Sequence, residues 1–203
     1  MQTPTLRDRR RLQTLRELHE AALHLAREGG LAAATVDAIT DRAGVSRRTF
    51  FNYYATKEDA LLGTTAPVVP EDALDRFLAH PGDDAFAEAV RLVIAVVTAM
   101  RQVEIPLEDP GRLLVEFPSL KDRLAQHVLA AEARIFAALD QLPAPGRKSS
   151  PGRDGDAARA LLMLAGTVLR FAYLREPGAA IGPSSAAIES AVSDFRHLLQ
   201  EIP

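Results

Sequence analysis

Apolar residues recur along the chain at helical spacing, three or four positions apart, and no segment alternates with the period of two that a strand requires. The first apolar stripe runs from Leu12 to Ala26 and is followed by Gly29 and Gly30, a pair typical of a helix C-terminus. The pattern predicts an all-α protein that begins with an amphipathic helix over about residues 12–29.

Three short helices are expected next, because each has its own start signal. Thr35 is a good N-cap for a helix that ends near Ala43, and Ser46 is a good N-cap for the following one. Thr56, with Asp59 three residues later, resembles a capping box that opens the third. Together with the first helix, these elements predict a compact head over residues 1–62.

Longer amphipathic or wholly apolar helices are expected in the remainder of the chain, residues 63–203, which predicts a helical bundle. They are separated by segments rich in Pro and Gly, and the stretch over 143–155 is expected to be a mobile loop. The expected helices cover residues 71–79, 84–103, 112–117, 119–142, 156–176 and 184–202.

The segment 35–57, TVDAITDRAGVSRRTFFNYYATK, has the spacing of a helix-turn-helix. Ile39 faces inward from the first helix and Phe50 from the second, Gly44 permits a sharp turn, and Val45 fills the core beneath it. The second helix is thereby braced against the first, so that its N-terminal residues project outward.

The residue types on the projecting helix suit the DNA major groove. Arg47 and Arg48 can each donate two hydrogen bonds to guanine, Asn52 can pair with adenine, and the Thr49 methyl group can contact thymine. Tyr53, Lys57 and Thr35 are placed where phosphates would run. The alternative is a tight helical hairpin with a solvated basic face, which the adjacent aromatic residues make less attractive. The expected DNA contacts are Thr35, Ser46, Arg47, Arg48, Thr49, Asn52, Tyr53 and Lys57.

Charge is unevenly distributed, although the whole chain carries only −3. Residues 1–57 hold ten Lys or Arg against six Asp or Glu, a net +4, and the remainder holds fourteen against twenty-one, a net −7. A basic head on an acidic body fits a protein that touches nucleic acid at one end, the alternative being a chance asymmetry. Arg7, Arg9, Arg10 and Arg11 either add phosphate or minor-groove contacts or form a solubilising tail.

Composition argues against catalysis, metals and membranes. Cysteine is absent, the five histidines are scattered, and no nucleophile elbow or phosphate-binding glycine loop is present, so we expect no catalytic residues, no metal and no cofactor. The N-terminus has no apolar signal region, and the longest apolar runs are about half of a membrane span. We expect a cytoplasmic protein without a membrane partner.

The head resembles the TetR family of bacterial repressors, whose DNA-binding region typically reads "T…IA..AGVS..T.Y.YF..K..L". The resemblance covers about residues 12–62, with departures at Thr40 (usually Ala), Phe51 (usually Tyr) and Tyr54 (usually Phe). Phe51 lacks a hydroxyl that could reach phosphate. The matching residues are Thr35, Ile39, Ala43, Gly44, Val45, Ser46, Thr49, Phe51, Tyr53, Tyr54, Lys57 and Leu61.

The resemblance implies a three-helix head and a C-terminal bundle, about nine helices in total, in a homodimer that binds a palindromic double-stranded operator. It also implies repression that ends when a small molecule enters the body. In the family's usual arrangement, helices 156–176 and 184–202 would form a two-fold four-helix interface. The corresponding domains are a DNA-binding domain over 1–62 and an effector-binding and dimerisation domain over 63–203.

The helices of the body have more apolar surface than one packed stripe needs, which indicates either a partner or a cavity for a largely apolar effector. Glu104 and Tyr173 are possible polar anchors. Core packing is the alternative for each candidate, and for His127 a hydrogen-bonded position in the core. A regulator without an effector, and an enzyme, are the competing functions. The candidate pocket residues are Val97, Met100, Phe117, Leu124, His127, Phe136, Met163 and Phe171.

Overall fold

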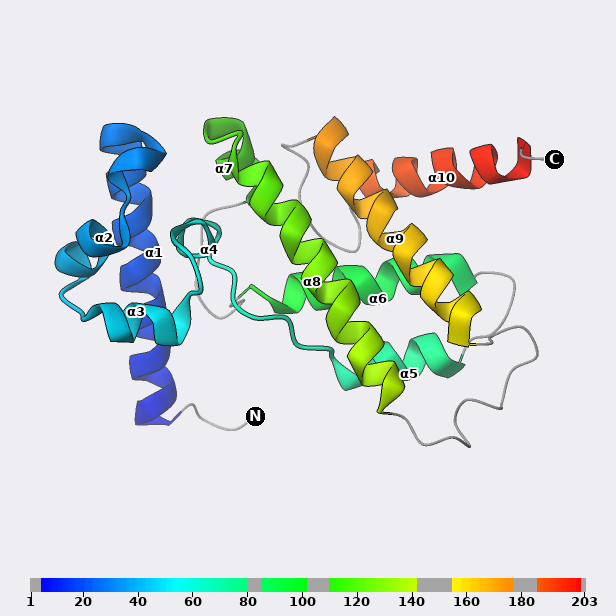
Figure 1. Cartoon of the computed structure of the whole chain (residues 1–203), viewed down its shortest axis with the longest axis horizontal. Helices are drawn as coiled ribbons and strands as arrows, with labels where there is room; N and C mark the ends of the chain where they lie inside the picture. The colour runs from blue at the N-terminus through cyan, green and yellow to red at the C-terminus, as the bar shows by residue number, and fades with distance from the viewer. Residues whose placement is uncertain (1–4, 80–84, 102–109, 142–154, 177–185, 202–203) are drawn as a thin grey trace. The chain divides into compact units, whose positions relative to one another are not determined.

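The computed structural model describes residues 5–79, 85–101, 110–141, 155–176 and 186–201 (Figure 1). These residues form ten helices and no strand, which confirms the predicted all-α class. The described helices exceed by one the nine that the resemblance implies, and they include a separate short helix that begins at Pro110, α7 (Pro110–Glu116). The expected loop over 143–155 and the expected anchor Glu104 lie outside the described residues, apart from Gly155.

The chain divides into two compact units. The first unit holds Met1–Ala66 and Met100–Arg123, and the second holds Pro67–Ala99 and Leu124–Pro203. One helix, α8 (Leu120–Asp140), contributes its first turn to the first unit and the rest of its length to the second. The boundary expected after residue 62 separates two functions, DNA binding and effector binding, and not two compact units. It stays a prediction.

The first unit is built on a long helix, α1 (Leu6–Ala33), drawn in blue in Figure 1. It starts earlier than the apolar stripe, so that the arginine-rich segment is helical, and it is kinked at Gly30, where φ is 74°. Two short helices pack on α1: α2 (Val36–Ala43) and α4 (Lys57–Leu62). The third short helix, α3 (Arg47–Tyr53), follows α2 and packs against it.

The predicted caps of these short helices are confirmed. The Thr35 hydroxyl accepts a hydrogen bond from the Ala38 amide, and the Ser46 hydroxyl accepts one from the Thr49 amide, each at 3.1 Å. Gly44 has φ 68°, a left-handed conformation that costs a residue with a side chain about 1–2 kcal/mol. The sharp turn between α2 and α3 therefore favours glycine at this position.

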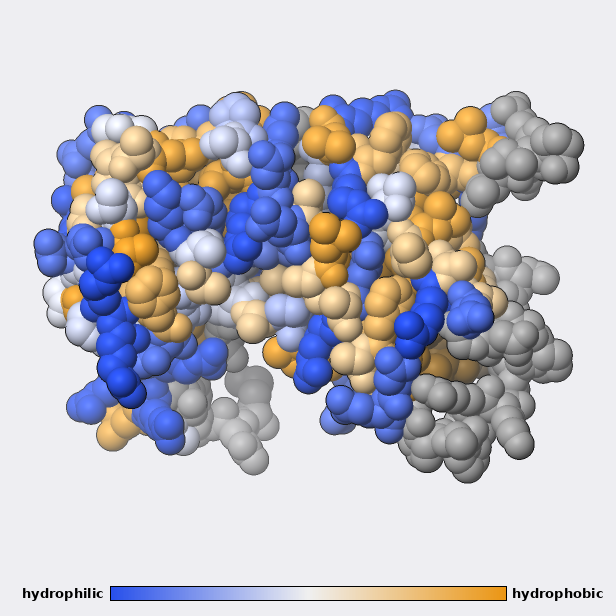
Figure 2. Space-filling view, in the orientation of Figure 1, coloured by the Kyte–Doolittle hydropathy of each residue, from blue (hydrophilic) through white to orange (hydrophobic). Residues whose placement is uncertain are grey.

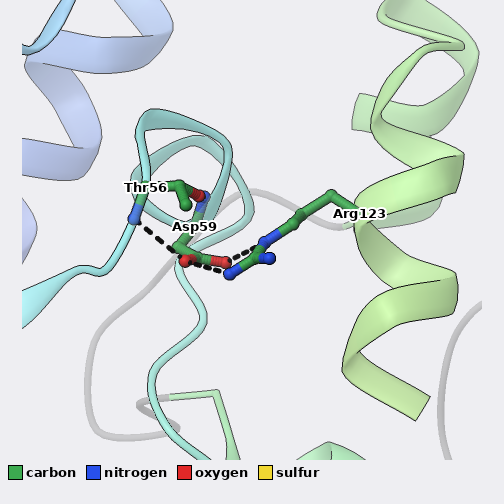
Figure 3. A network of polar contacts seen from close by, with 3 residues as sticks. All are labelled: Thr56, Asp59 and Arg123. Atoms are coloured by element: carbon green, nitrogen blue, oxygen red, sulfur yellow. Dashed lines mark hydrogen bonds and ion pairs between the residues drawn. The ribbon is translucent and has the colours of Figure 1, made fainter. Parts of the chain in front are cut away.

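Two bidentate ion pairs hold α7 and the start of α8 in the first unit. Arg27 of α1 donates to both carboxylate oxygens of Glu116 at 2.8 Å. Arg123 donates to both carboxylate oxygens of Asp59, the residue that completes the predicted capping box of α4 with Thr56 (Figure 3). An antiparallel bridge between Thr64 and Arg101 also lies in this unit.

The second unit is a bundle of longer helices. Its members besides α8 are α5 (Glu71–Ala79), α6 (Ala85–Ala99), α9 (Gly155–Arg175) and α10 (Ala186–Glu201). Helix α6 packs against α5 and α9, and α9 also packs against α10. By length and composition alone α9 passes as a membrane span, with a mean hydropathy of 1.4 over Asp156–Arg175. Because its buried positions contact α6 and α10, we interpret α9 as a core helix.

A buried polar contact joins α8 to α9. Glu132 is buried and accepts a hydrogen bond from Arg170 at 2.8 Å. Gly166 leaves the space for this carboxylate, because a Cβ at position 166 would lie 1.5 Å from Glu132 Oε1. Burial raises the pKa of Glu132, and the hydrogen bond from Arg170 opposes that shift.

Candidate nucleic-acid interface

Helix α3 is oriented by one buried aromatic side chain, that of Phe50. Phe50 contacts the ring of Tyr54, which is also buried and whose hydroxyl donates to the Leu15 carbonyl at 3.2 Å. With Phe50 directed into the core, Arg47, Arg48, Phe51 and Asn52 are exposed on α3. The helix therefore presents its arginines to solvent, as the sequence predicts.

The two arginines at the start of α3 differ in their contacts. Arg47 forms an ion pair with Asp37 of α2, and both side chains are largely exposed. Exposed pairs of this kind contribute about 0–1 kcal/mol, so a guanine can replace Asp37 as the partner at small cost. Arg48 has no ion pair or hydrogen bond to the described residues. An exposed guanidinium group is thus available to a ligand at position 48, and a second one is weakly held at position 47.

The three serine and threonine residues among the expected contacts are all engaged locally. Thr35 and Ser46 are the N-caps described above, and the Ser46 and Thr49 hydroxyl groups lie 2.9 Å apart. Their first role is therefore to start α2 and α3 at defined residues. Thr35 and Ser46 remain exposed and Thr49 is half-buried, so their expected DNA contacts stay predictions.

Lys57 is held by the protein itself. Its ammonium group donates to the Leu31 carbonyl at 2.7 Å and is half-buried, which ties the start of α4 to the end of α1. The sequence did not indicate this structural contact, because position 57 matched a phosphate-binding position of the motif. Its expected role at phosphate stays a prediction.

Asn52 and Tyr53, at the end of α3, line a cleft of about 640 Å³ together with the N-terminal turns of α1. Arg7, Arg10 and Arg11 lie on its other side. All eight expected DNA-contact residues thus lie in the first unit, and arginines of α1 join two of them. The signal for this was present in the sequence, since residues 7, 10 and 11 share one face of a helix, but α1 was expected to begin after them.

The eight expected pocket residues are spread over both units. Met100 and Phe117 belong to the first unit and the other six to the second. In the second unit, Val97, Leu124 and His127 are buried, and Phe136 is half-buried. Met163 and Phe171 lie on the exposed side of α9, with 57% and 39% of their surfaces accessible. Exposure on α9 suits a subunit interface better than an internal pocket.

A surface cleft in the second unit lies between α6 and α10 and is lined by none of those eight residues. Its volume is about 280 Å³, and its apolar lining includes Val90, Ile94, Ile188 and Val192. Arg91, Glu189 and Arg196 surround this lining. The sequence pattern placed these residues on amphipathic faces without indicating that the two helices leave a hollow between them.

Comparison with known families identifies the head. Residues 18–62 match the family model described as bacterial regulatory proteins, tetR family. The match spans the buried half of α1 and all of α2, α3 and α4, and it confirms the resemblance found in the sequence. No curated protein matches the chain.

Proposed function

We propose that the chain, whose residues 18–62 match the tetR family of bacterial regulatory proteins, is a DNA-binding transcriptional regulator of that family. In this proposal it is a homodimeric repressor that a small, largely apolar ligand releases from a palindromic operator. In this proposal residues 1–62 bind DNA, residues 63–203 bind the effector and dimerise, and the protein acts in the cytoplasm without catalysis. The proposal rests on the orientation of α3, in which Phe50 is buried and Arg48 and Asn52 are exposed.

The base contacts that we propose follow from that orientation. Arg47 and Arg48 read guanine and Asn52 reads adenine, each bidentate contact discriminating by about 1–3 kcal/mol. Thr49 contacts a thymine methyl group, and Ser46, Thr35, Tyr53 and Lys57 contact phosphates. Phe51, 51% exposed beside these residues, has no hydroxyl group for a phosphate and can pack only against an apolar surface such as a thymine methyl.

An exposed apolar stripe supports the homodimer. Met163, Phe171 and Leu174 are exposed on α9, and Phe171 contacts Phe195 of α10 with ring centroids 5.6 Å apart. Leu198 extends the exposed apolar surface on α10. Hydrophobic side chains are also visible over α9 in Figure 2. A second copy of the chain that covers this stripe would form a self-complementary two-fold interface, which demands two half-sites about 34–36 Å apart.

Buried groups of the second unit support an effector site. Val97 on α6 and Leu124 on α8 supply apolar surface, and His127 is buried one helical turn from Leu124. The Tyr173 hydroxyl is buried without a hydrogen-bond partner among the described residues, and burial raises the pKa of this phenol. A neutral hydroxyl of this kind can anchor one polar atom of an otherwise apolar ligand.

Selection of duplexes from a random pool by the purified chain tests the proposal. We expect one enriched palindrome, which binds more tightly than a scrambled duplex between 50 and 200 mM salt. Arg48→Ala should relax the preference at one position of each half-site, whereas the off-site control Arg134→Ala should leave it unchanged. The absence of any enriched sequence would contradict the proposal.

A further inference from the structure

The N-terminal turns of α1 place three arginines beside the end of the recognition helix. Arg7, Arg10 and Arg11 line the cleft that also contains Asn52 and Tyr53, together with Leu6 and Thr14. Positions 7, 10, 11 and 14 are separated by three and four residues and therefore share one face of the helix. The cleft thus has a continuous basic wall on α1 and a polar wall on α3.

The three arginines are available to a ligand. All are exposed, and none forms an ion pair or hydrogen bond with the described side chains. Figure 2 shows a mostly hydrophilic surface around the N-terminal end of α1. Three guanidinium groups on one face, without carboxylate partners among the described side chains, repel each other, and an anion in the cleft would relieve that repulsion.

We infer that this cleft binds the DNA backbone, with Arg7, Arg10 and Arg11 donating to successive phosphate oxygens next to the bases that α3 reads. The inference rests on the proposed function and adds to it phosphate contacts from arginines that precede residues 18–62, the part of the chain that matches the family. Because Asn52 and Tyr53 lie on the other wall, a strand in the cleft would continue directly from the recognition helix.

The chemistry favours phosphates over bases for these contacts. Arginine forms paired, charge-assisted hydrogen bonds with phosphate oxygens, and such contacts carry no sequence information. Each phosphate that a protein neutralises contributes about 0.9 to the slope of log affinity against log salt concentration. The three arginines would therefore strengthen binding to every duplex alike and increase its dependence on salt.

The test compares the triple variant Arg7→Ala, Arg10→Ala, Arg11→Ala with Arg9→Ala in fluorescence-anisotropy titrations. Arg9 does not line the cleft, because two residues from Arg7 or Arg11 correspond to about 200° around the helix. We expect the triple variant to lose at least about tenfold in affinity at 150 mM salt and about 2–3 in the salt slope for each bound protomer. Arg9→Ala should change the slope by less than about 1.

Measurement on two duplexes separates this inference from the proposed function. The loss should be equal on the selected palindrome and on a scrambled duplex, because phosphates are common to both. A wild-type protein that prefers no sequence would overturn the proposed function. The slopes of log affinity against log salt concentration on the scrambled duplex would still show whether the cleft binds phosphates. An equal slope for the triple variant and Arg9→Ala would overturn the inference.

A lysine variant distinguishes phosphates from the minor groove. Replacing Arg7, Arg10 and Arg11 by lysine keeps the charge as a point cation, so we expect most of the affinity and the salt slope to be retained. A changed base preference in the alanine or lysine variant, with the salt slope unchanged, would overturn the assignment to phosphates. Circular dichroism melts should be the same for all variants, because the replaced side chains are exposed.

Discussion

Arg123 and Asp59 form a bidentate ion pair in which Arg123 Nε lies 2.7 Å from Asp59 Oδ1 and Arg123 Nη2 lies 2.6 Å from Asp59 Oδ2 (Figure 3). The same Oδ2 accepts the Thr56 amide at 3.1 Å, so one buried carboxylate both starts α4 and binds the first turn of α8. The hydrogen bond to Asp59 raises the pKa of Arg123, which remains charged. Both residues lie in the first unit, so this pair holds the first turn of α8 against α4 within that unit.

Arg123→Ala should destabilise the protein strongly. It leaves the Asp59 carboxylate, 5% exposed, without its cationic partner, and such losses cost about 3 kcal/mol. The control is Arg159→Ala, which removes an exposed pair with Asp140 and should cost less than about 1 kcal/mol. Urea denaturation measures both values. Equal losses for the two variants would show that Asp59 gains little from Arg123.

Lys57→Ala should reduce stability as well as DNA affinity. Its ammonium group donates to the Leu31 carbonyl, and a hydrogen bond to a charged group contributes about 1.5–3 kcal/mol, less where water reaches it. Arg48→Ala is the matched comparison, since it removes an exposed cation without a partner among the described residues and should leave the melting temperature unchanged. A Lys57→Ala melt equal to that of wild type would leave phosphate binding as the single role of Lys57.

The parts of the fold that the sequence predicts well are those determined by local chemistry. Thr35, Ser46 and Thr56 start helices where capping requires, and Gly44 adopts the positive φ expected of the turn. Long-range contacts could not be predicted, because nothing in the local pattern links Asp59 to Arg123, sixty-four residues away. The same holds for the arginines of α1, because no local pattern predicts that they lie beside the end of α3.

The exposed side of α9 shows a second limit of sequence patterns. Apolar residues at helical spacing indicate a face that is buried, but they do not specify whether the same chain or a second copy covers that face. The pattern therefore places Met163 and Phe171 among the pocket candidates, although the chain leaves both exposed. Leu162 and Val168, interleaved with them in the same helix, are fully buried.

Gly166→Ala should destabilise the second unit, the reverse of the usual effect in a helix. Alanine is favoured over glycine by about 1 kcal/mol in a helix interior. Here, however, the new Cβ would lie 1.5 Å from Glu132 Oε1, and displacement of a packed group costs about 1–3 kcal/mol. In a Glu132→Ala background the clash is absent, so the same substitution should become stabilising by up to about 1 kcal/mol. If Gly166→Ala changes the free energy of unfolding in the same direction in both backgrounds, the packing described for α8 and α9 is contradicted.

Glu132→Gln should change the pH dependence of stability. Burial raises the pKa of Glu132 above its ordinary value of 4.5. As the pH rises, Glu132 therefore loses its proton in the unfolded chain before it does so in the folded one. The stability that the neutral carboxyl group contributes is lost as the pH rises towards the pKa of the folded state. A tenfold difference between the folded and unfolded acid dissociation constants corresponds to about 1.4 kcal/mol. The wild type should therefore lose stability relative to Glu132→Gln between pH 4 and the folded pKa. The lowered pKa of Glu116 acts in both proteins and cancels in the difference. A stability difference independent of pH would contradict the raised pKa of Glu132.

Leu174→Glu should weaken the proposed homodimer. Leu174 is 66% exposed on α9 in the single chain, so the substitution does not disturb the folded subunit. A two-fold interface would bury the new carboxylate twice, and we expect the dissociation constant to rise at least about tenfold, which corresponds to about 1.4 kcal/mol. Leu129→Glu is the matched control, because Leu129 is 51% exposed on α8, outside the proposed interface. Sedimentation velocity over a range of concentrations measures both constants. If the two variants dissociate alike, the interface does not lie on the exposed stripe of α9.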